Sequence, residues 1–384
     1  MAQAVDFSKT KNLGIYFGTF APFHQGHYQQ LIKALSENDS VIVFVSGYKN
    51  DRGDKNELPL AKRVRLLKET LKDEPAVFID SICEDNIPEY PEGWTPWLSM
   101  LINKIHKSLR DNTTLSEMNW YVGEPEYKEE LDKRLPEHAD VIKYFKNVKM
   151  NAILADRSDF DISATKIRNN PIKYYSQIGQ GFKRHFVKKV AFVGAPSSGK
   201  STLLKRVAKT FGSNFSVETA RGYEENSAIN DDDLNAMDYK HFILDQFTEN
   251  SKVINNSNNG LVFLDTTSLA TKVYAELYLS KEDNEFLKPF FDDSFKNEEV
   301  DLFIVTGKGK QFVLDGSRSE EWADDSDKFV TKTKEIMKEY LKLHPNCKVL
   351  YVNNLSNGFG YYERYQQVLQ AVENATNYHA GHLK

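Results

Sequence analysis

The chain has 384 residues, of which 40% are hydrophobic and 27% charged, a length and composition typical of a globular protein with about two domains. Its formal net charge of −5 does not support a broadly basic nucleic-acid binder, although it leaves room for a local basic patch. The two cysteines, Cys83 and Cys347, form no CxxC pattern, which argues against a disulfide framework or a cysteine-rich zinc site. Without a membrane-spanning apolar run or a signal-peptide core, we expect a soluble cytoplasmic protein.

Short β-rich runs alternate with helical patterns in the first half of the chain. Apolar residues at helical spacing predict helices over residues 26–38 and 61–71. Strands are predicted at 13–18, 41–46, 76–80, 119–123, 141–145 and 152–155. This alternation predicts an α/β fold, in which a Rossmann-like domain has a parallel sheet and crossover helices.

A second unit begins with a predicted strand at 187–193, followed by a glycine-rich turn and a helix over 202–211. Further strands are predicted at 261–265, 302–306 and 349–353. The stretch 169–188 has weak periodicity, and we place the boundary there, with domains over residues 1–182 and 183–384. Because this stretch is not rich in serine and glycine, we expect packed rather than freely tethered domains.

Residues 194–201 read GAPSSGKS and match the P-loop pattern G-x-x-x-x-G-K-[ST] between a strand and a helix. Main-chain amides and the helix dipole suit phosphate oxygens, Lys200 can reach the β- and γ-phosphates, and Ser201 can hold Mg²⁺. Asp265 closes the run LVFLD and is the candidate second metal ligand, unless it is a capping residue. A chance glycine-rich turn is the alternative for the loop. The predicted nucleotide-binding residues are Gly194, Ala195, Pro196, Ser197, Ser198, Gly199, Lys200, Ser201 and Thr202.

Two further clusters in the second unit suit phosphoryl transfer. Glu218 can take the proton of a substrate hydroxyl, Arg221 can neutralise developing charge, and Tyr223 lies beside them in sequence. The alternative for this cluster is a solvated polar loop. Asp315 and Arg318 belong to a segment with turn residues that can form a lid over the phosphates.

The first predicted strand is followed by GTFAPFHQGH at residues 18–27 and then by a helix. This string resembles the nucleotidyltransferase superfamily of adenylyltransferases and cytidylyltransferases. His24 and His27 at a helix N-terminus can neutralise charge on a leaving pyrophosphate, because such a transfer needs alignment and charge neutralisation without a covalent intermediate. The alternatives are a metal site, for which no third ligand is evident, or a structural role for both histidines. The predicted nucleotide-binding residues here are Gly18, Thr19 and Phe20.

A second string, ISATKIR at residues 162–168, resembles another motif of the same superfamily. Ser163 is a natural N-cap, so the helix N-terminus and the Thr165 hydroxyl can face phosphate, and Arg168 adds positive charge. The alternative is an ordinary capped helix. Further cations either grip a phosphate or are solvated surface charges: Lys49, Arg52, Arg63 and Arg65.

Between these motifs, Gly93, Trp94 and Trp97 belong to a loop rich in proline and glycine. Indole rings stack well on a cationic or electron-poor aromatic ligand. The equally weighted alternative is that the two tryptophans anchor the loop in a core.

Taken in order, these motifs resemble the NadR-type family of bifunctional nicotinamide-nucleotide adenylyltransferases and ribosylnicotinamide kinases. The resemblance runs from about residue 13 to the C-terminus and includes YPxGW, ISATKIR, NPxxYY, GAPSSGKST, ETARGY, LVFLDT and LDGSRS. It implies that the N-terminal domain makes NAD and pyrophosphate from nicotinamide mononucleotide and ATP. It also implies that the C-terminal P-loop kinase domain phosphorylates nicotinamide riboside with ATP and Mg²⁺.

The resemblance also implies roles for individual residues. In the first domain, Trp94 or Trp97 would stack on the nicotinamide ring, and the ATP phosphates would be served by Gly18, Thr19, His24, His27 and Arg168. In the second domain, nucleotide and Mg²⁺ would be handled by Lys200, Ser201 and Asp265. The riboside or the lid would involve Glu218, Arg221, Tyr223, Asp315 and Arg318.

Three departures from the family pattern matter. About a dozen residues precede the first strand, too few for the helix-turn-helix of some members, so we expect no direct DNA binding. The family's D-T-D reads Asp265-Thr266-Thr267, and the segment before the lid lacks a tryptophan. The sequence leaves several alternatives open. Only the adenylyltransferase could be active, or the chain could be an ATP or NAD sensor without turnover. The acceptor in the first domain could instead be a pantetheine or cholinephosphate compound, and the protein could form homo-oligomers.

Overall fold

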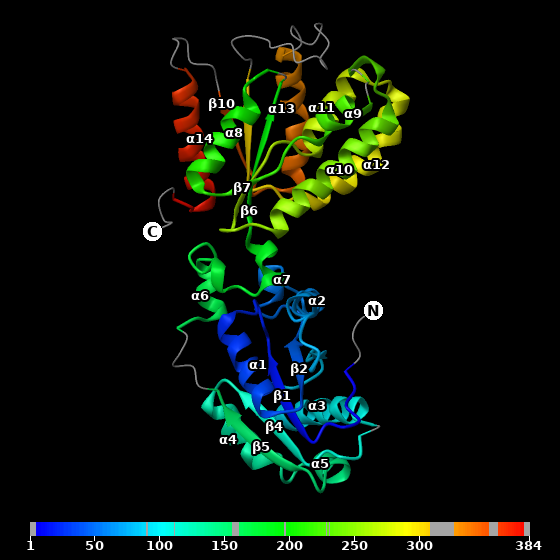
Figure 1. Cartoon of the computed structure of the whole chain (residues 1–384), viewed down its shortest axis with the longest axis vertical. Coiled ribbons are helices and arrows are strands. Elements are labelled where there is room, and N and C mark those ends of the chain that lie inside the picture. The colour runs from blue at the N-terminus through cyan, green and yellow to red at the C-terminus, as the bar shows by residue number, and fades with distance from the viewer. Residues whose placement is uncertain are drawn as a thin grey trace. The chain divides into compact units, whose positions relative to one another are not determined.

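Runs of buried β-branched and aromatic residues form two parallel sheets, one in each of the units Met1–His185 and Phe186–Lys384 (Figure 1). The boundary expected from the sequence lies after residue 182, within the short helix α7 (Gln180–Lys183) and just before η3 (Arg184–Phe186). The computed structural model describes residues 5–89, 91–110, 112–155, 161–195, 197–227, 229, 231–307, 326–352 and 360–379.

The sheet of the first unit has the strand order β3-β2-β1-β4-β5, and all its neighbouring pairs are parallel. Its strands are β1 (Asn12–Gly18), β2 (Ser40–Gly47), β3 (Val77–Cys83), β4 (Glu117–Val122) and β5 (Lys149–Leu154). The central strands are apolar on both faces because helices cover both sides of the sheet. The order reverses between β1 and β4, and ligands of such sheets bind at the carboxyl ends of the strands beside this point.

The helices of the first unit complete the crossovers between these strands. They are α1 (Gln25–Glu37), η1 (Asp54–Asn56), α2 (Leu60–Thr70), α3 (Trp94–Ser108), α4 (Pro125–Arg134), α5 (Ala139–Tyr144), α6 (Ala164–Asn169) and η2 (Tyr175–Gln177). The predicted helices at 26–38 and 61–71 are confirmed by α1 and α2.

The predicted strand at 141–145 is wrong, because this segment forms helix α5. Val141 and Phe145 are four residues apart and are both buried in the core, whereas Ile142 is 51% exposed. The ring of His138 accepts a hydrogen bond from the main-chain N–H of Asp140 and caps the helix. A short apolar run with β-branched residues fits either structure, and here the burial of every fourth position favours the helix.

The sheet of the second unit has the order β10-β9-β6-β8-β7, again with parallel pairs. Its strands are β6 (Lys188–Gly194), β7 (Asn214–Phe215), β8 (Leu261–Leu264), β9 (Leu302–Thr306) and β10 (Lys348–Val352). The predicted fold, two α/β domains with parallel sheets, is therefore confirmed. The predicted strands of this unit are confirmed too, with ends shifted by a residue.

Helices surround this second sheet, and three of them pack into a layer beside it (Figure 1). They are α8 (Lys200–Phe211), α9 (Thr219–Ser227), η4 (Asp231–Asp233), α10 (Ala236–Asn255), α11 (Ser268–Tyr278), α12 (Lys281–Asn297), α13 (Ser326–Leu343) and α14 (Gly360–Thr376). Helices α10, α11 and α12 share an apolar cluster that includes Tyr239, Phe242 and Phe291. Within the described ranges, no helix combines the length and apolar character needed to cross a membrane.

Candidate active sites

A cavity of ≈ 640 Å³ opens in the first unit, where β1 and β2 end. It is the site that the strand order indicates, since the sheet reverses beside β1. Residues from both predicted motifs meet there although more than 130 positions separate them in the chain. The predicted residues among its lining are Gly18, Thr19, Phe20, His24, His27, Trp97, Ser163 and Thr165.

The two histidines lie at the N-terminus of α1. Their rings stack with centroids 3.7 Å apart, and the main-chain N–H of His24 donates to Nδ1 of His27 at 3.3 Å. A Cβ on Gly26 would lie 3.3 Å from the His24 ring and from Ile162, so glycine permits this close packing. The positive end of the α1 dipole adds to the imidazole donors. Among the described residues, no three His, Cys, Asp or Glu side chains lie close enough together to hold a metal ion. The zinc alternative therefore gains no support.

Thr19 is held by two arginines. The Arg52 guanidinium donates to its Oγ1 at 2.8 Å, and Arg63 donates to its backbone oxygen at 2.7 Å. Arg63 is fully buried and pairs with buried Asp51 at 2.7 Å, which shows a supporting role rather than a grip on phosphate. Arg65 is 78% exposed and pairs with Glu69. Of the four cations considered from the sequence, only Arg52 lines the cavity.

Arg168 links the two motifs of this site. Its guanidinium donates to the backbone oxygen of Ala21 at 2.6 Å and to Oγ1 of Thr165 at 2.9 Å. Burial, and then the charge of Arg52, lower the pKa of Arg168, which stays charged because its ordinary value is so high. Ser163 caps α6, as predicted, by accepting from the main-chain N–H of Lys166. Two guanidinium groups therefore flank the turn after β1.

The two tryptophans have different surroundings, and neither lies in a loop, since α3 begins at Trp94. Trp97 lines the cavity, donates its Nε1–H to Glu84 at 3.0 Å and packs edge-on against Phe17. Both indoles are 8% exposed and belong to the apolar core of this unit, but Trp94 does not line the cavity. A Cβ on Gly93 would fall 2.1 Å from the backbone oxygen of Pro88, so this glycine serves packing. Trp97 is therefore the tryptophan placed to meet a ligand.

Glu84 and Tyr127 also line this cavity, and motif reasoning missed them. Burial raises the pKa of Glu84 above its ordinary range, and the hydrogen bond from Trp97 opposes this. Burial likewise raises the pKa of Tyr127, which packs against Phe17 and both tryptophans. The signal that could have found Glu84 is its position directly after a parallel strand, where such sheets place ligands.

The turn after β6 has the geometry of a phosphate cradle. Ser197 and Gly199 have φ values of 56° and 79°, and such left-handed residues turn successive amides toward one side of the loop. A Cβ on Gly194 would lie 1.9 Å from Oγ1 of Thr306, so only glycine fits there. Ser198 Oγ also contacts Thr306 Oγ1, at 2.8 Å. Ala195 and Ser198 are buried, Thr202 is exposed in the first turn of α8, and Pro196 lies outside the described residues.

Lys200, Ser201 and Asp265 converge at the start of α8. Nζ of Lys200 lies 2.7 Å from Oδ1 of Asp265 and 3.5 Å from Oε2 of Glu218. Ser201 Oγ donates to the same Asp265 oxygen at 3.1 Å. Burial alone would lower the pKa of Lys200, but the charges of Glu218 and Asp265 raise it above its usual value. The lysine is therefore cationic beside two candidate metal-binding oxygens.

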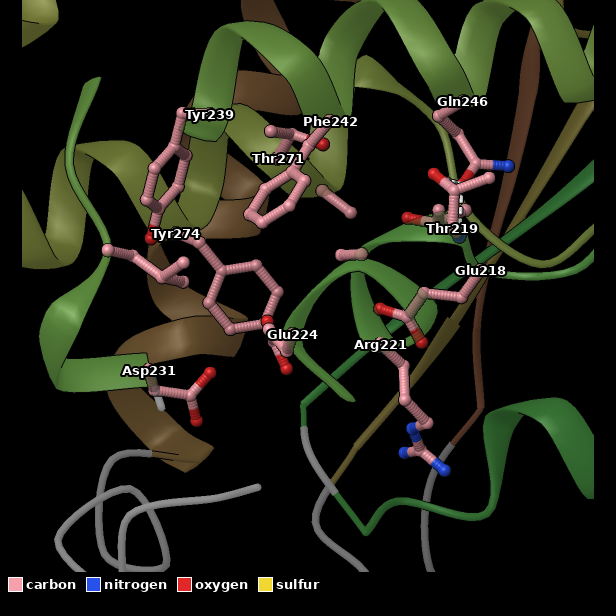
Figure 2. A pocket seen from close by; sticks show the side chains of 14 residues that line it. Glu218, Thr219, Arg221, Glu224, Asp231, Tyr239, Phe242, Gln246, Thr271 and Tyr274 are labelled. Carbon is pink, nitrogen blue, oxygen red and sulfur yellow. Dashed lines mark hydrogen bonds between the residues drawn. The ribbon is translucent and has the colours of Figure 1, made fainter. Parts of the chain in front are cut away.

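Glu218 and Arg221 line a second cavity (Figure 2), and Glu218 connects it with the lysine. The cavity measures ≈ 80 Å³ and lies among α9, α10 and α11. Tyr223 does not line it, because its hydroxyl donates to Asp238 at 2.7 Å. The motifs did not identify the remaining polar and aromatic lining residues, among them Glu224, Asp231, Tyr239, Phe242, Gln246 and Tyr274.

The remaining predictions for this unit have different outcomes. Asp315 and Arg318 lie outside the described residues, so their lid role stays a prediction. Of the cluster at Glu218, only Glu218 itself lies in a loop, directly before α9, whereas Arg221 and Tyr223 lie on that helix, which begins at Thr219. Thr267, where the family pattern has an aspartate, is fully buried at the N-cap of α11 and is not among the cavity lining.

Two family descriptions match the chain, one in each unit. Residues 15–170 match the family described as Cytidylyltransferase-like, and residues 189–350 match the AAA domain. Two curated relatives carry the name "Trifunctional NAD biosynthesis/regulator protein NadR". The protein of Salmonella typhimurium is 27% identical over 342 residues, covering 86% of this chain and 77% of the relative. That of Escherichia coli is 26% identical over 341 residues with the same coverage.

Solved structures extend this likeness over nearly the whole chain. A NadR protein in complex with NR has 40% sequence identity and a TM-score of 0.85, covering 96% of this chain and 98% of that one. A NadR protein in complex with NAD and AMP-PNP has 39% identity and a TM-score of 0.82, covering 96% of each chain. This chain therefore belongs to the NadR family.

Proposed function

We propose that this protein is an enzyme of NAD synthesis with two active sites. The first unit transfers the adenylyl group of ATP to nicotinamide mononucleotide, and the second phosphorylates nicotinamide riboside with ATP. The observation that carries this proposal is that one chain of the NadR family has two separate strand–turn–helix motifs suited to phosphate. The first opens onto a cavity, and the second is joined to another cavity through the contact between Lys200 and Glu218. NadR proteins with bound NR, and with bound NAD and AMP-PNP, support both halves of it. We expect the enzyme to act in the cytoplasm.

In the first unit, a phosphate oxygen of the mononucleotide attacks the α-phosphorus of ATP while pyrophosphate leaves. The transfer takes up and releases no net proton, so catalysis comes from aligning the reactants and neutralising the charge of the leaving group. His24, His27 and the N-terminus of α1 face the region where the leaving pyrophosphate gains charge. Arg52 and Arg168 flank the same turn and add two permanent positive charges.

One side of this cavity is aromatic and suits the pyridine ring of the mononucleotide. Phe17, Trp97 and Tyr127 form an aromatic group around one side of it. An electron-rich indole face attracts a cationic pyridinium ring. Glu84 behind Trp97 fixes the orientation of the indole and adds a carboxylate near the positive ring.

In the second unit, the 5′-hydroxyl oxygen of the riboside attacks the γ-phosphorus of ATP, the bond to ADP breaks, and the hydroxyl proton passes to a base. Glu218 is the candidate base, because it lies at the rim shared by the P-loop lysine and the cavity. Lys200 and the P-loop amides bind the phosphates.

Mg²⁺ fits this site by the chemistry of its donors. Ser201 Oγ and Asp265 Oδ1 are oxygen atoms 3.1 Å apart at the mouth of the P-loop, and Mg²⁺ binds oxygen from a few protein groups together with substrate phosphates. When bound, the ion neutralises charge on the β- and γ-phosphates. We therefore assign Ser201 and Asp265 as its protein ligands.

The lining of the second cavity suits a cationic riboside. Glu218, Glu224 and Asp231 bring three carboxylates against the single guanidinium of Arg221 (Figure 2). Nicotinamide riboside carries a positive pyridinium ring, and the acid riboside adds a negative carboxylate that this lining would repel. The cavity is smaller than ligand sites usually are, so we expect it to widen as the riboside enters.

Product analysis with both pyridine substrates tests the proposal. The purified protein with nicotinamide mononucleotide, ATP and Mg²⁺ should yield NAD and pyrophosphate. With nicotinamide riboside it should yield the mononucleotide first and NAD afterwards. Absence of both products at varied pH and metal concentration refutes the proposal. Formation of NAD from the mononucleotide alone would leave a single-activity adenylyltransferase, and tight NAD binding without turnover would indicate a sensor.

A further inference from the structure

Two buried amide side chains lie one turn apart on α10, next to the second site. Gln246 is 2% exposed and Asn250 is 4% exposed. Neither matched a motif, and the mechanism proposed above uses neither. Figure 2 shows Gln246 reaching from its helix toward Thr219, beside Glu218. Buried amides cost free energy unless their donors and acceptors are all used, so their partners are informative.

Gln246 uses its full hydrogen-bonding capacity on the segment around Glu218. Its Oε1 accepts from the main-chain N–H of Thr219 at 3.0 Å and from the Thr219 hydroxyl at 3.2 Å. Its Nε2 donates to the backbone oxygen of Val217 at 3.1 Å and to Oδ1 of Asn250 at 3.0 Å. An amide group offers two acceptor positions and two donors. The side chain thus holds the backbone on both sides of Glu218.

Asn250 extends the same network to the segment that follows Asp265. Its Oδ1 accepts from Gln246, and its Nδ2 donates to the backbone oxygen of Thr266 at 3.0 Å. Reversing either amide would set N–H against N–H or oxygen against oxygen, so the partners determine both orientations. The pair therefore connects the backbone at Val217 and Thr219 with the backbone at Thr266.

Both connected segments carry a carboxylate that contacts the P-loop lysine. Glu218 lies 3.5 Å and Asp265 2.7 Å from Nζ of Lys200. The two segments come from different parts of the chain, before α9 and after β8. A displacement of either carboxylate by about 1 Å would lower the rate of a reaction that depends on alignment. The amide pair is placed to prevent such a displacement.

We propose that Gln246 and Asn250 are positioning residues for phosphoryl transfer, which set the placement of Glu218 relative to Asp265 through the backbone segments they join. This inference rests on the proposed kinase function. Their effect should appear in kcat for riboside phosphorylation, because the pair orients reacting groups. It should spare the adenylyltransferase of the same chain, whose site is built from other residues.

Two nearly isosteric substitutions test the pair in the full-length protein. Asn250→Asp keeps the acceptor for Gln246 and loses the donor to Thr266, whereas Gln246→Glu keeps the acceptor for Thr219 and loses both donors. Asn256→Asp is the matched control, because this exposed residue at the C-cap of the same helix donates its side-chain amide to a local backbone oxygen, that of Lys252. Asn250→Ser is a neutral third variant that introduces no buried charge.

We expect each of the two acidic variants to lower kcat for riboside phosphorylation by about 10- to 100-fold, with KM for ATP within about threefold. The double variant should lose little more than the worse single variant, because both act on one network. The pH profile of kcat should also shift, since Glu218 is displaced. NAD formation from the mononucleotide should be unchanged in every preparation, and Asn256→Asp should behave as wild type in both reactions.

Several results would overturn the inference. One is an unchanged kcat in variants whose second unit is folded, as judged by hydrogen exchange of the β6 and β8 amides. Another is a loss confined to KM for the riboside, which would make Gln246 a binding residue of the cavity it lines. If the acidic variants unfold, Asn250→Ser must show the kcat loss, and wild-type kcat there contradicts the proposal. A wild-type protein inactive on riboside would instead refute the proposed function.

Discussion

The ammonium of Lys200 donates to both the side-chain Oδ1 and the backbone oxygen of Asp265, at 2.7 and 2.6 Å. The end of β8 and the start of α8 are thereby joined at the point where a nucleotide would meet a metal ion. Because Ser201 contacts the same carboxylate, Asp265 is placed for two tasks: it orients the P-loop lysine, and under the proposed function it would bind the metal.

Asp265→Asn should therefore impair the kinase strongly. The amide removes the negative charge that a divalent cation needs while keeping the shape of the side chain. We expect kcat for riboside phosphorylation to fall roughly 100-fold or more, with partial recovery at raised Mg²⁺. NAD formation from the mononucleotide serves as the internal control. Wild-type kinase turnover in this variant would contradict the assignment of Asp265.

Arg63→Met should destabilise the first unit. Arg63 is fully buried against Asp51, so the substitution leaves a buried carboxylate without its partner, which costs roughly 3–5 kcal/mol. The substitution also removes the hydrogen bonds that Arg63 donates to the backbone oxygens of Thr19 and Ser46. Because Thr19 lines the cavity, NAD formation should become slower. Chemical denaturation followed through the buried tryptophans of this unit measures the loss. Arg65→Met is the control, and its exposed pair should contribute less than about 1 kcal/mol. Equal effects of the two substitutions would refute the supporting role.

Trp97→Phe and Trp94→Phe should separate ligand binding from packing. Loss of the Trp97 indole removes both a stacking surface in the cavity and the hydrogen bond to Glu84. We expect KM for the mononucleotide to rise about tenfold. Trp94→Phe should lower stability by about 1 kcal/mol through a core cavity and leave this KM unchanged. Steady-state kinetics of NAD formation distinguish the two, and the reverse pattern would assign ligand contact to Trp94.

Glu298 should make the stability of the second unit pH-dependent. It accepts from the main-chain N–H and the hydroxyl of Ser268, but burial raises its pKa to about 7, from 4.5 for the ordinary side chain. Between these two values the folded state holds a proton that the unfolded state has released, so stability falls as pH rises through this window. Glu298→Gln cannot ionise. Its free energy of unfolding relative to wild type should therefore increase by about 1–3 kcal/mol from pH ~5 to pH ~8.

Hydrogen exchange of the β9 amides measures this difference in the second unit alone. Asn297→Asp is the control, because this exposed residue ends α12 directly before Glu298, and it should follow wild type across the range. A constant difference between Glu298→Gln and wild type would show that Glu298 has an ordinary pKa.

Local sequence allowed both strand–turn–helix motifs to be located, because their proposed chemistry depends on neighbouring residues. His24 and His27, or Gly199 and Lys200, need only a strand before them and a helix after them. Each helix and strand around these turns was predictable for the same reason. The segment at Val141 failed because a short β-branched run carries no information about which neighbour it will bury against.

The walls of both cavities were not predictable, since their residues come from separate elements. Glu84 follows β3 and Tyr127 lies on α4, yet both line the cavity at the end of β1. Gln246 on α10 belongs to no motif, and its four hydrogen bonds, to Val217, Thr219 and Asn250, become evident only in the folded chain. For Arg63 the sequence left a phosphate contact and a solvated surface charge open, and it is neither, because its burial depends on Asp51, which lies 12 positions away.

The most direct test of two independent sites is a pair of single substitutions assayed with riboside and with mononucleotide. Lys200→Ala should abolish riboside phosphorylation while NAD formation from the mononucleotide continues at the wild-type rate. The His27→Ala variant should still convert riboside to mononucleotide, which accumulates because the adenylyl transfer is lost. If either substitution stops both reactions, or if both variants convert riboside to NAD as wild type does, the account of two separate active sites is wrong.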